Sequence, residues 1–236
     1  MIYFRGIRPY YGDDAFLTSC RVQPIPKIEN ETAIIPKRPG VLSVDKMHRE
    51  RLIHVSFELL GHSAQKNADI AESIAIWAET TGDERLILDE KPDRFYLAKL
   101  YESGEVDYAA EYPVFDLTFI CSNPYAYSVK EHSEKVGETI AYYGTVATWP
   151  CIRFTPETDV RAPTWSDGTH RISFDSDYTA LAGHEVFIDC ANRRVTDNGE
   201  SIMQHLSIES DWLKLERFTN KIFGSGGRVE WREAYL

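Results

Sequence analysis

The stretch from Pro92 to Ser128 constrains the fold more than any other part of the chain, because it encodes two long strands in succession. Residues 95–101 and 114–121 are rich in the aromatic and β-branched side chains that fit a pleated, half-buried surface. Successive side chains of a strand point to opposite faces, so Phe115, Leu117, Phe119 and Cys121 share one face, which must be buried. A polar connection containing Gly104 separates the two segments. We predict a hairpin at the centre of a sheet.

Further strands and one helix come before this hairpin. Residues 16–22, 51–60 and 85–89 are predicted strands; the second has one apolar face, formed by Ile53, Val55, Phe57 and Leu59. Between strands, residues 67–80 predict an amphipathic helix, with Ile70, Ile74 and Trp77 spaced by four and three. Asn67 is the expected N-cap, Gly82 the expected stop signal, and Trp77 the expected core anchor. The first half therefore predicts an α+β layer with one helix on a sheet.

The second half is typical of an all-β domain. The predicted strands are short and regularly spaced: residues 139–143, 151–155, 170–175, 185–190, 193–196, 206–209 and 228–231. Asp197-Asn198-Gly199 is a strong tight-turn signal, and Ala191-Asn192 is a second one. Such spacing favours an antiparallel sandwich. With the domain boundary in the polar stretch 128–137, we expect a mainly β chain with domains at 1–132 and 133–236.

Composition excludes several classes of function. The 236 residues carry a net charge of -11, whereas binding a nucleic-acid backbone needs clustered Lys and Arg. No segment approaches the roughly 20 apolar residues that cross a bilayer, and no N-terminal signal is visible. We therefore expect synthesis in a cytoplasm, with no membrane insertion. The cysteines, at 20, 121, 151 and 190, lie far apart in apolar or β-like surroundings, which favours buried free thiols over disulfides.

A proline-rich segment spans residues 24–42. Pro24, Pro26, Pro36 and Pro39 interrupt apolar residues among charges, and proline lacks the amide that a central strand must donate. The segment is therefore an edge strand or an extended arm. Either it is a loop covered by its own domain, or its apolar residues pack against a neighbouring subunit. In the second case the subunit-interface candidates are Ile34, Ile35, Val41 and Leu42.

No catalytic or metal-ligating motif stands out. The seven histidines show no ligand spacing, and the nucleophile elbow, the phosphate-binding loop and the dinucleotide fingerprint are all missing from the sequence. We expect no enzyme activity, no metal and no cofactor. Two alternatives remain: a hydrolase using the acid pairs Asp175/Asp177 or Glu209/Asp211, and a carbohydrate-binding adhesin module that stacks sugars on Trp165 or Trp212.

Several of these features together carry a family resemblance. The order of these features resembles that in the distal tail proteins of long-tailed, non-contractile phages. The features are the Pro39-Gly40 arm, the 51–60 strand, the helix ending near Trp77, the segment 93–96 and the end of the hairpin at 119–125. The second half also resembles their galectin-like C-terminal sandwich, with a turn at Asn198-Gly199 and a final strand running to the C-terminus. The resemblance covers essentially the whole chain.

The resemblance implies a structural role in the virion, at the phage tail tip. Proteins of this family form a hexameric ring built by the N-terminal domain, with an arm that reaches the neighbouring subunit. The implied partners are the major tail tube protein, a tail-tip or tail-associated lysin protein and a receptor-binding protein. One departure concerns sugar: the His-x-Asn-Pro-Arg motif of true galectins is missing, so we expect no galectin-style binding.

Overall fold

The computed structural model describes residues 2–9, 14–37, 39–40 and 42–236. The chain divides into two compact units. The first comprises the residues up to Ala126 together with Leu236, and the second comprises Tyr127–Tyr235. The division into independently folding domains after residue 132 stays a prediction. Among the described residues, no helix combines the length and the apolar character needed to cross a bilayer.

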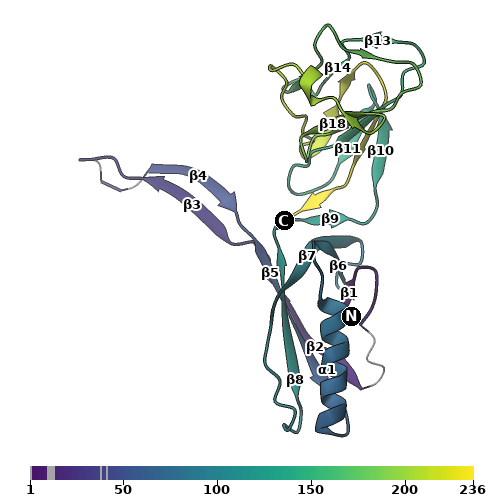
Figure 1. Cartoon of the computed structure of the whole chain (residues 1–236). Coiled ribbons are helices and arrows are strands. Elements are labelled where there is room, and N and C mark those ends of the chain that lie inside the picture. The colour runs from purple at the N-terminus through teal and green to yellow at the C-terminus, as the bar shows by residue number, and fades with distance from the viewer. Residues whose placement is uncertain (1, 10–13, 38, 41) are drawn as a thin grey trace. The chain divides into compact units, whose positions relative to one another are not determined.

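The first unit is built on an antiparallel sheet in which six strands run in the order β1-β6-β7-β8-β5-β2 (Figure 1). Their bounds are β1 (Ile2–Phe4), β2 (Ala15–Val22), β5 (Arg51–Leu59), β6 (Glu84–Leu88), β7 (Arg94–Ser103) and β8 (Val114–Cys121). The predicted hairpin is the pair β7–β8, which occupies the middle of this order. The prediction of a central hairpin is confirmed.

The buried face of the sheet is the one that the alternation predicts. In β5, Ile53, Val55, Phe57 and Leu59 are each at most 1% exposed. They pair with β8, so that Val55 lies opposite Leu117. Because directly paired residues of neighbouring strands project to the same side, the apolar rows of both strands combine into one core surface.

The helix α1 (Ala64–Ala78) covers this surface, but both of its ends differ from the prediction. The N-cap is Ser63, whose hydroxyl accepts a hydrogen bond from the amide of Lys66 at 3.2 Å. Asn67 therefore lies inside the first turn, where it is buried. The helix ends at Ala78 because Glu79 takes an extended conformation, three residues before Gly82. The predicted cap and stop residues were both wrong.

Trp77 holds the helix to the sheet, as predicted. Its ring meets three aromatic rings edge-on, with centroid distances of 5.8 Å to Phe4, 6.3 Å to Phe57 and 6.1 Å to Phe119. Its indole Nε1 donates a hydrogen bond to the carbonyl of Ile7 at 3.0 Å. The ring is thus both packed and hydrogen-bonded, which a buried tryptophan needs.

The second unit consists of short strands and one 3₁₀ turn, η1 (Met203–His205). Its main sheet has the order β10-β22-β12-β17-β18-β19, and the remaining strands form smaller sheets, β11-β20, β13-β16 and β15-β14-β21. The bounds are β9 (Ala126–Ser128), β10 (His132–Lys135), β11 (Thr139–Tyr142), β12 (Cys151–Phe154), β13 (Val160–Arg161), β14 (Thr164–Ser166), β15 (Arg171–Ser173), β16 (Thr179–Ala180), β17 (Val186–Asp189), β18 (Arg194–Asp197), β19 (Glu200–Ser201), β20 (Phe218–Lys221), β21 (Phe223–Gly224), β22 (Arg228–Trp231) and β23 (Ala234–Tyr235), which pairs with β9. The prediction of a mainly β chain with one α-helix is confirmed.

One predicted strand of the second unit is wrong. Residues 206–209 form no strand: Leu206 makes a single bridge to Phe174, and the side chain of Ile208 is 100% exposed. The chain turns there instead, because the amide of Ser210 donates to the carbonyl of Ser207 at 2.9 Å. The Asn198-Gly199 turn between β18 and β19 is confirmed, and both residues have positive φ angles, 48° and 86°.

The four cysteines are free thiols, as predicted. Cys121 and Cys190 are buried in the cores of the first and second units, and Cys20 and Cys151 are partly exposed. Burial raises the pKa of Cys20 to about 11 and that of Cys121 to about 12, so both thiols are protonated at neutral pH.

Candidate functional site

The proline-rich segment leads into a two-stranded arm. β3 (Ile28–Ala33) and β4 (Leu42–His48) form an antiparallel ladder of their own, from Ile28 opposite His48 to Ala33 opposite Leu42. The register shifts between Glu31 and Thr32, which marks a bulge. Figure 1 shows the arm as a continuation of the β2–β5 pair. The sequence analysis placed an arm here but missed its second strand, residues 42–48.

Polar contacts hold the root of the arm. The amide of Arg49 donates to the carbonyl of Lys27 at 2.7 Å, which carries the ladder on from β2–β5. His48 Nδ1 lies 3.0 Å from the hydroxyl of Tyr125, and the two rings pack edge to face. Arg49 also pairs with Glu29. These contacts fix the direction in which the arm leaves the β2–β5 pair, although the arm itself lies outside the core.

Nothing in the described chain covers the arm. All described residues from 28 to 47 are exposed, and the fraction reaches 80% for Ile34, 39% for Ile35 and 44% for Leu42. The fourth candidate, Val41, lies outside the described residues. The alternative of a loop covered by its own domain is therefore wrong. The structure adds three exposed apolar residues to the arm, namely Ile28, Val44 and Met47. Leu42 and Val44 alternate with Ser43 and Asp45, but Met47 breaks this alternation, so the strand signal in the sequence is short.

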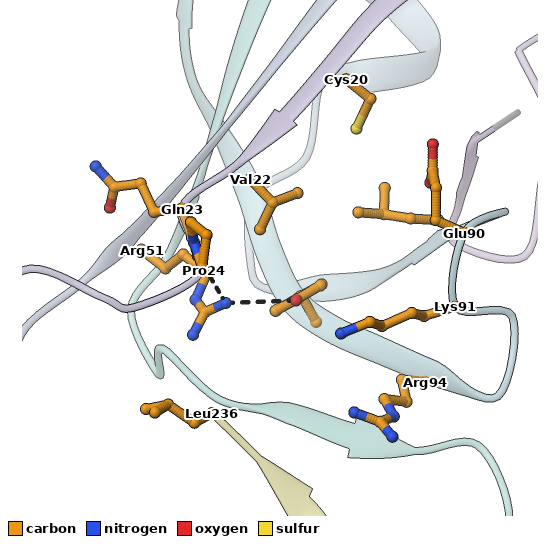
Figure 2. Close-up of a pocket in the computed structure, with 11 residues that line it drawn as sticks. Cys20, Val22, Gln23, Pro24, Arg51, Glu90, Lys91, Arg94 and Leu236 are labelled. Atoms are coloured by element: carbon orange, nitrogen blue, oxygen red, sulfur yellow. Dashed lines mark hydrogen bonds between the residues drawn. The ribbon is translucent and has the colours of Figure 1, made fainter.

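A pocket of about 370 Å³ lies in the first unit where the arm begins (Figure 2). Gln23 and Pro24 contribute from the chain between β2 and β3, Arg51 from the start of β5, and Tyr96 from β7. A second hollow of about 520 Å³ also uses Gln23 and Pro24, together with Leu52. Arg51 and Leu52 are successive strand residues whose side chains point to opposite faces. The arm root is thus hollowed on both faces of its ladder.

Arg51 continues the buried row of β5 but is a cation. Its side chain is 1% exposed. Nη1 donates to the carbonyl of Gln23 at 3.0 Å and lies 3.5 Å from the hydroxyl of Tyr96. The guanidinium carbon also lies 5.4 Å from the centre of the Tyr96 ring. Burial is the main cause that raises the pKa of Tyr96, so its hydroxyl stays neutral. The sequence analysis did not single out Arg51.

Of the two tryptophans proposed for sugar stacking, Trp165 has no accessible ring and Trp212 keeps part of its surface exposed. Trp165 is fully buried, and its Nε1 donates to the carbonyl of Gly226 at 2.8 Å. Because no face of its ring is accessible, it has no surface on which a sugar could stack. Trp212 is partly buried and packs against the core of the second unit. Sugar stacking on Trp212 alone stays a prediction.

The acid pairs considered for a hydrolase lie on open surface. The carboxylate of Asp177 is 73% exposed and lies 3.8 Å from His205. The carboxylate of Asp211 is 70% exposed and lies 4.0 Å from His170. General acid catalysis needs a carboxyl group shielded from water. Neither pair has that environment.

Comparisons with known proteins agree with the family resemblance. Residues 10–121 match the family described as "Phage tail protein RIFT-related domain", and residues 143–235 match "Siphovirus-type tail component, C-terminal domain". The distal tail protein of Bacillus phage SPP1 is 27% identical over 143 residues, which are 58% of this chain and 56% of that protein. The chain belongs to the distal tail protein family. It is therefore a structural component of a phage tail. The match spans little more than half of that relative.

Solved structures of phage tail proteins share the fold. The crystal structure of the SPP1 distal tail protein, described as a paradigm of the hub adsorption apparatus in phages that infect Gram-positive bacteria, has a TM-score of 0.85 at 19% identity. The match covers 100% of this chain and 98% of that one. A chain of the phage P2 baseplate in its Ca-activated conformation has a TM-score of 0.52 at 8% identity, over 94% and 91% of the two chains. At these identities the likeness shows the fold alone.

Proposed function

We propose that this distal tail protein assembles into a hexameric ring at the end of the tail tube. The ring joins the tube protein to the tail-tip or tail-associated lysin protein and supports the attachment of a receptor-binding protein. Membership in the family supports the role, and the fold match over the whole chain supports a shared architecture. The observation that carries the proposal is the arm, β3–β4, with its exposed apolar side chains.

Contact with a partner surface should stabilise the exposed arm. A two-stranded hairpin without a covering layer is marginally stable in water. Its outer edges offer unpaired backbone groups, and its side chains include Ile34, Leu42 and Val44. Burial of such residues against a neighbouring copy removes apolar area from water. Contact with a neighbouring copy would therefore stabilise the arm.

The predicted interface residues keep their role in this proposal. Ile34, Ile35 and Leu42, together with Val41, are the residues that we assign to the subunit contact. The first unit builds the ring, and the second unit offers a docking surface. The excess of acidic residues suits a channel that DNA passes without being held. Catalysis has no part in this function.

The double variant Ile34→Asp/Ile35→Asp tests the proposal. It places two charges where the ring would bury two isoleucines, and the residues are exposed in the single chain, so each subunit should stay folded. The matched control is Ile208→Asp, since Ile208 is 100% exposed and lies in a turn of the second unit. Sedimentation velocity over a concentration series, with circular dichroism as the folding control, measures assembly.

We expect the double variant to remain folded and to lose the ring, whereas the control assembles like the unaltered protein. If the double variant assembles as well as the control, the arm is not a subunit contact, and the proposal loses the observation that carries it.

A further inference from the structure

The connection between β7 and β8 exposes large apolar side chains. It comprises residues 104–113, and Tyr108, Tyr112 and Val114 in or beside it are 37%, 61% and 40% exposed. Tyrosine is enriched where proteins meet, because its ring offers apolar contact area and its hydroxyl remains able to form hydrogen bonds. This end of the central hairpin therefore has the side chains of a contact surface.

The connection is attached to the sheet, so its side chains are presented in defined positions. The amide of Gly104 donates to the carbonyl of Asp116 at 2.7 Å, and the amide of Leu59 donates to the carbonyl of Pro113 at 2.9 Å. The side chain of Val106 packs against the core of the first unit. A partner that docks here meets a surface that is already ordered, which lowers the entropic cost of binding.

The same segment is strongly acidic. Residues 100–129 contain no Lys, Arg or His, and all of their acidic residues lie between 102 and 116, namely Glu102, Glu105, Asp107, Glu111 and Asp116. Among the described residues, the first four of these carboxylates take part in no ion pair. We call the exposed side chains of residues 102–116 the loop surface. It combines tyrosines with uncompensated negative charge.

The tip of the arm has the opposite charge. Residues 32–44, which we call the tip, include Lys37 and Arg38 and no acidic residue, in a chain whose net charge is -11. Lys37 is exposed and has no ion-pair partner among the described residues; Arg38 lies outside them. The neighbouring Ile34 is 80% exposed. The tip is therefore basic and aliphatic, which complements the acidic and aromatic loop surface.

The tip and the loop surface lie at opposite ends of β5. In the β5–β8 ladder Arg51 is opposite Cys121 and Glu58 is opposite Val114. The connection to β8 is thus beside the end of β5, whereas the arm continues from its start (Figure 1). At about 3.3 Å per residue, β5 alone separates the two by about 26 Å, and the arm adds to this distance. The tip therefore points away from the loop surface of its own chain.

We propose that the tip docks on the loop surface of the next copy of this chain. Lys37 faces the carboxylates there, and the aliphatic side chains of the tip pack on the exposed tyrosines. The inference rests on the proposed ring and names the surface that receives the arm. Because two different surfaces meet, the contact is head-to-tail: every docked copy leaves one tip and one loop surface free, and only closure into a ring occupies them all.

Reversal of the charges tests the contact. The tip variant is Lys37→Glu/Arg38→Glu, and the loop variant is Glu105→Lys/Glu111→Lys. Each should weaken association in sedimentation velocity about tenfold, because like charges then face each other. The control Lys130→Glu/Lys135→Glu changes the net charge as the tip variant does, but at exposed lysines of the second unit, and should associate like the unaltered protein.

A chain that combines the tip and loop variants distinguishes a direct contact from a general effect of charge. Its net charge equals that of the unaltered protein, and opposite charges face each other again, so association should return to within about threefold of the original. If the combined chain associates no better than the tip variant, or if the tip variant associates like its control, the tip does not dock on the loop surface.

Cross-linking between copies tests the docking whether or not a ring closes. A carbodiimide joins a lysine amine directly to a carboxylate, so it reports only groups in contact. In a mixture of ¹⁴N- and ¹⁵N-labelled full-length protein, mass spectrometry should find Lys37 of one copy joined to a loop-surface carboxylate of another. Rings without this cross-link would overturn the inference and leave the ring intact. The cross-link without rings would support the docking and contradict the ring, and the lack of both would contradict both.

Discussion

Replacing Arg51 with methionine should leave the free protein about as stable as before, although it removes a fully buried side chain. Methionine is unbranched and flexible, so it fills the space along the stem of the arginine without strain. The change removes the two nitrogens that lack partners, Nε and Nη2. It also removes the hydrogen bond to the carbonyl of Gln23 and the contact with the ring of Tyr96.

The expected gain and the expected losses in the free energy of unfolding nearly cancel. Relief of two unpartnered N–H groups stabilises the variant by about 2–6 kcal/mol. Loss of a charged hydrogen bond costs about 1.5–3 kcal/mol, and loss of the cation–π contact costs about 0.5–2 kcal/mol. The carbonyl of Gln23 is not trapped without a partner, because Gln23 is exposed to water. We therefore expect the free energy of unfolding to stay within about 1.5 kcal/mol of its original value.

Urea unfolding followed by circular dichroism measures this difference, with Arg21→Met, an exposed arginine of β2, as the control that should change stability by less than about 0.5 kcal/mol. Destabilisation by more than about 3 kcal/mol would show that the guanidinium is already compensated, and the reasoning would fail.

The remaining predictions concern the core and the thiols. Trp77→Ala should destabilise the first unit by about 3–5 kcal/mol, because a buried ring in contact with three aromatic side chains is removed. The control Ile76→Ala, on the exposed side of the same helix, should lower the free energy of unfolding by less than about 1 kcal/mol. Equal losses of the two variants in urea unfolding would contradict the packing of α1. Stability should fall as pH rises from 9 towards 12, because burial keeps Cys121 protonated in the folded state up to a pKa of about 12, whereas an unfolded thiol releases its proton near 9.0. This loss should shrink in Cys121→Ser relative to the unaltered protein, and equal pH profiles of the two proteins in urea unfolding would refute the assignment.

The elements that could be predicted from sequence are those whose side chains face one large core. The rows Ile53 to Leu59 and Phe115 to Cys121 are apolar at every second position because one face of β5 and β8 is buried. Trp77 was predictable as the anchor of the helix for the same reason. The helix ends were not, because Ser63 and Asn67 are both good caps, and the choice between them depends on where β5 ends and the chain turns.

The candidate site was only partly predictable. Proline content and apolar residues among charges pointed to an arm, but β4 has no buried face, and the core therefore imposes no regular pattern on its sequence. The Arg51 pocket was not predictable at all. It combines the carbonyl of Gln23, the start of β5 and Tyr96 of β7, which are far apart in the chain. A charged residue at the end of an apolar row is normally exposed, and only the folded structure shows that this one is buried.

The mass of the purified protein in solution tests the central claim most directly. Light scattering after size exclusion, over a range of concentrations, should give about 163 kDa, six times the 27.1 kDa of one chain, and a larger mass when the ring binds added tail tube protein. Negative-stain images of the same fractions should show six-fold rings. A single chain at every concentration, with and without the tube protein, would contradict the ring.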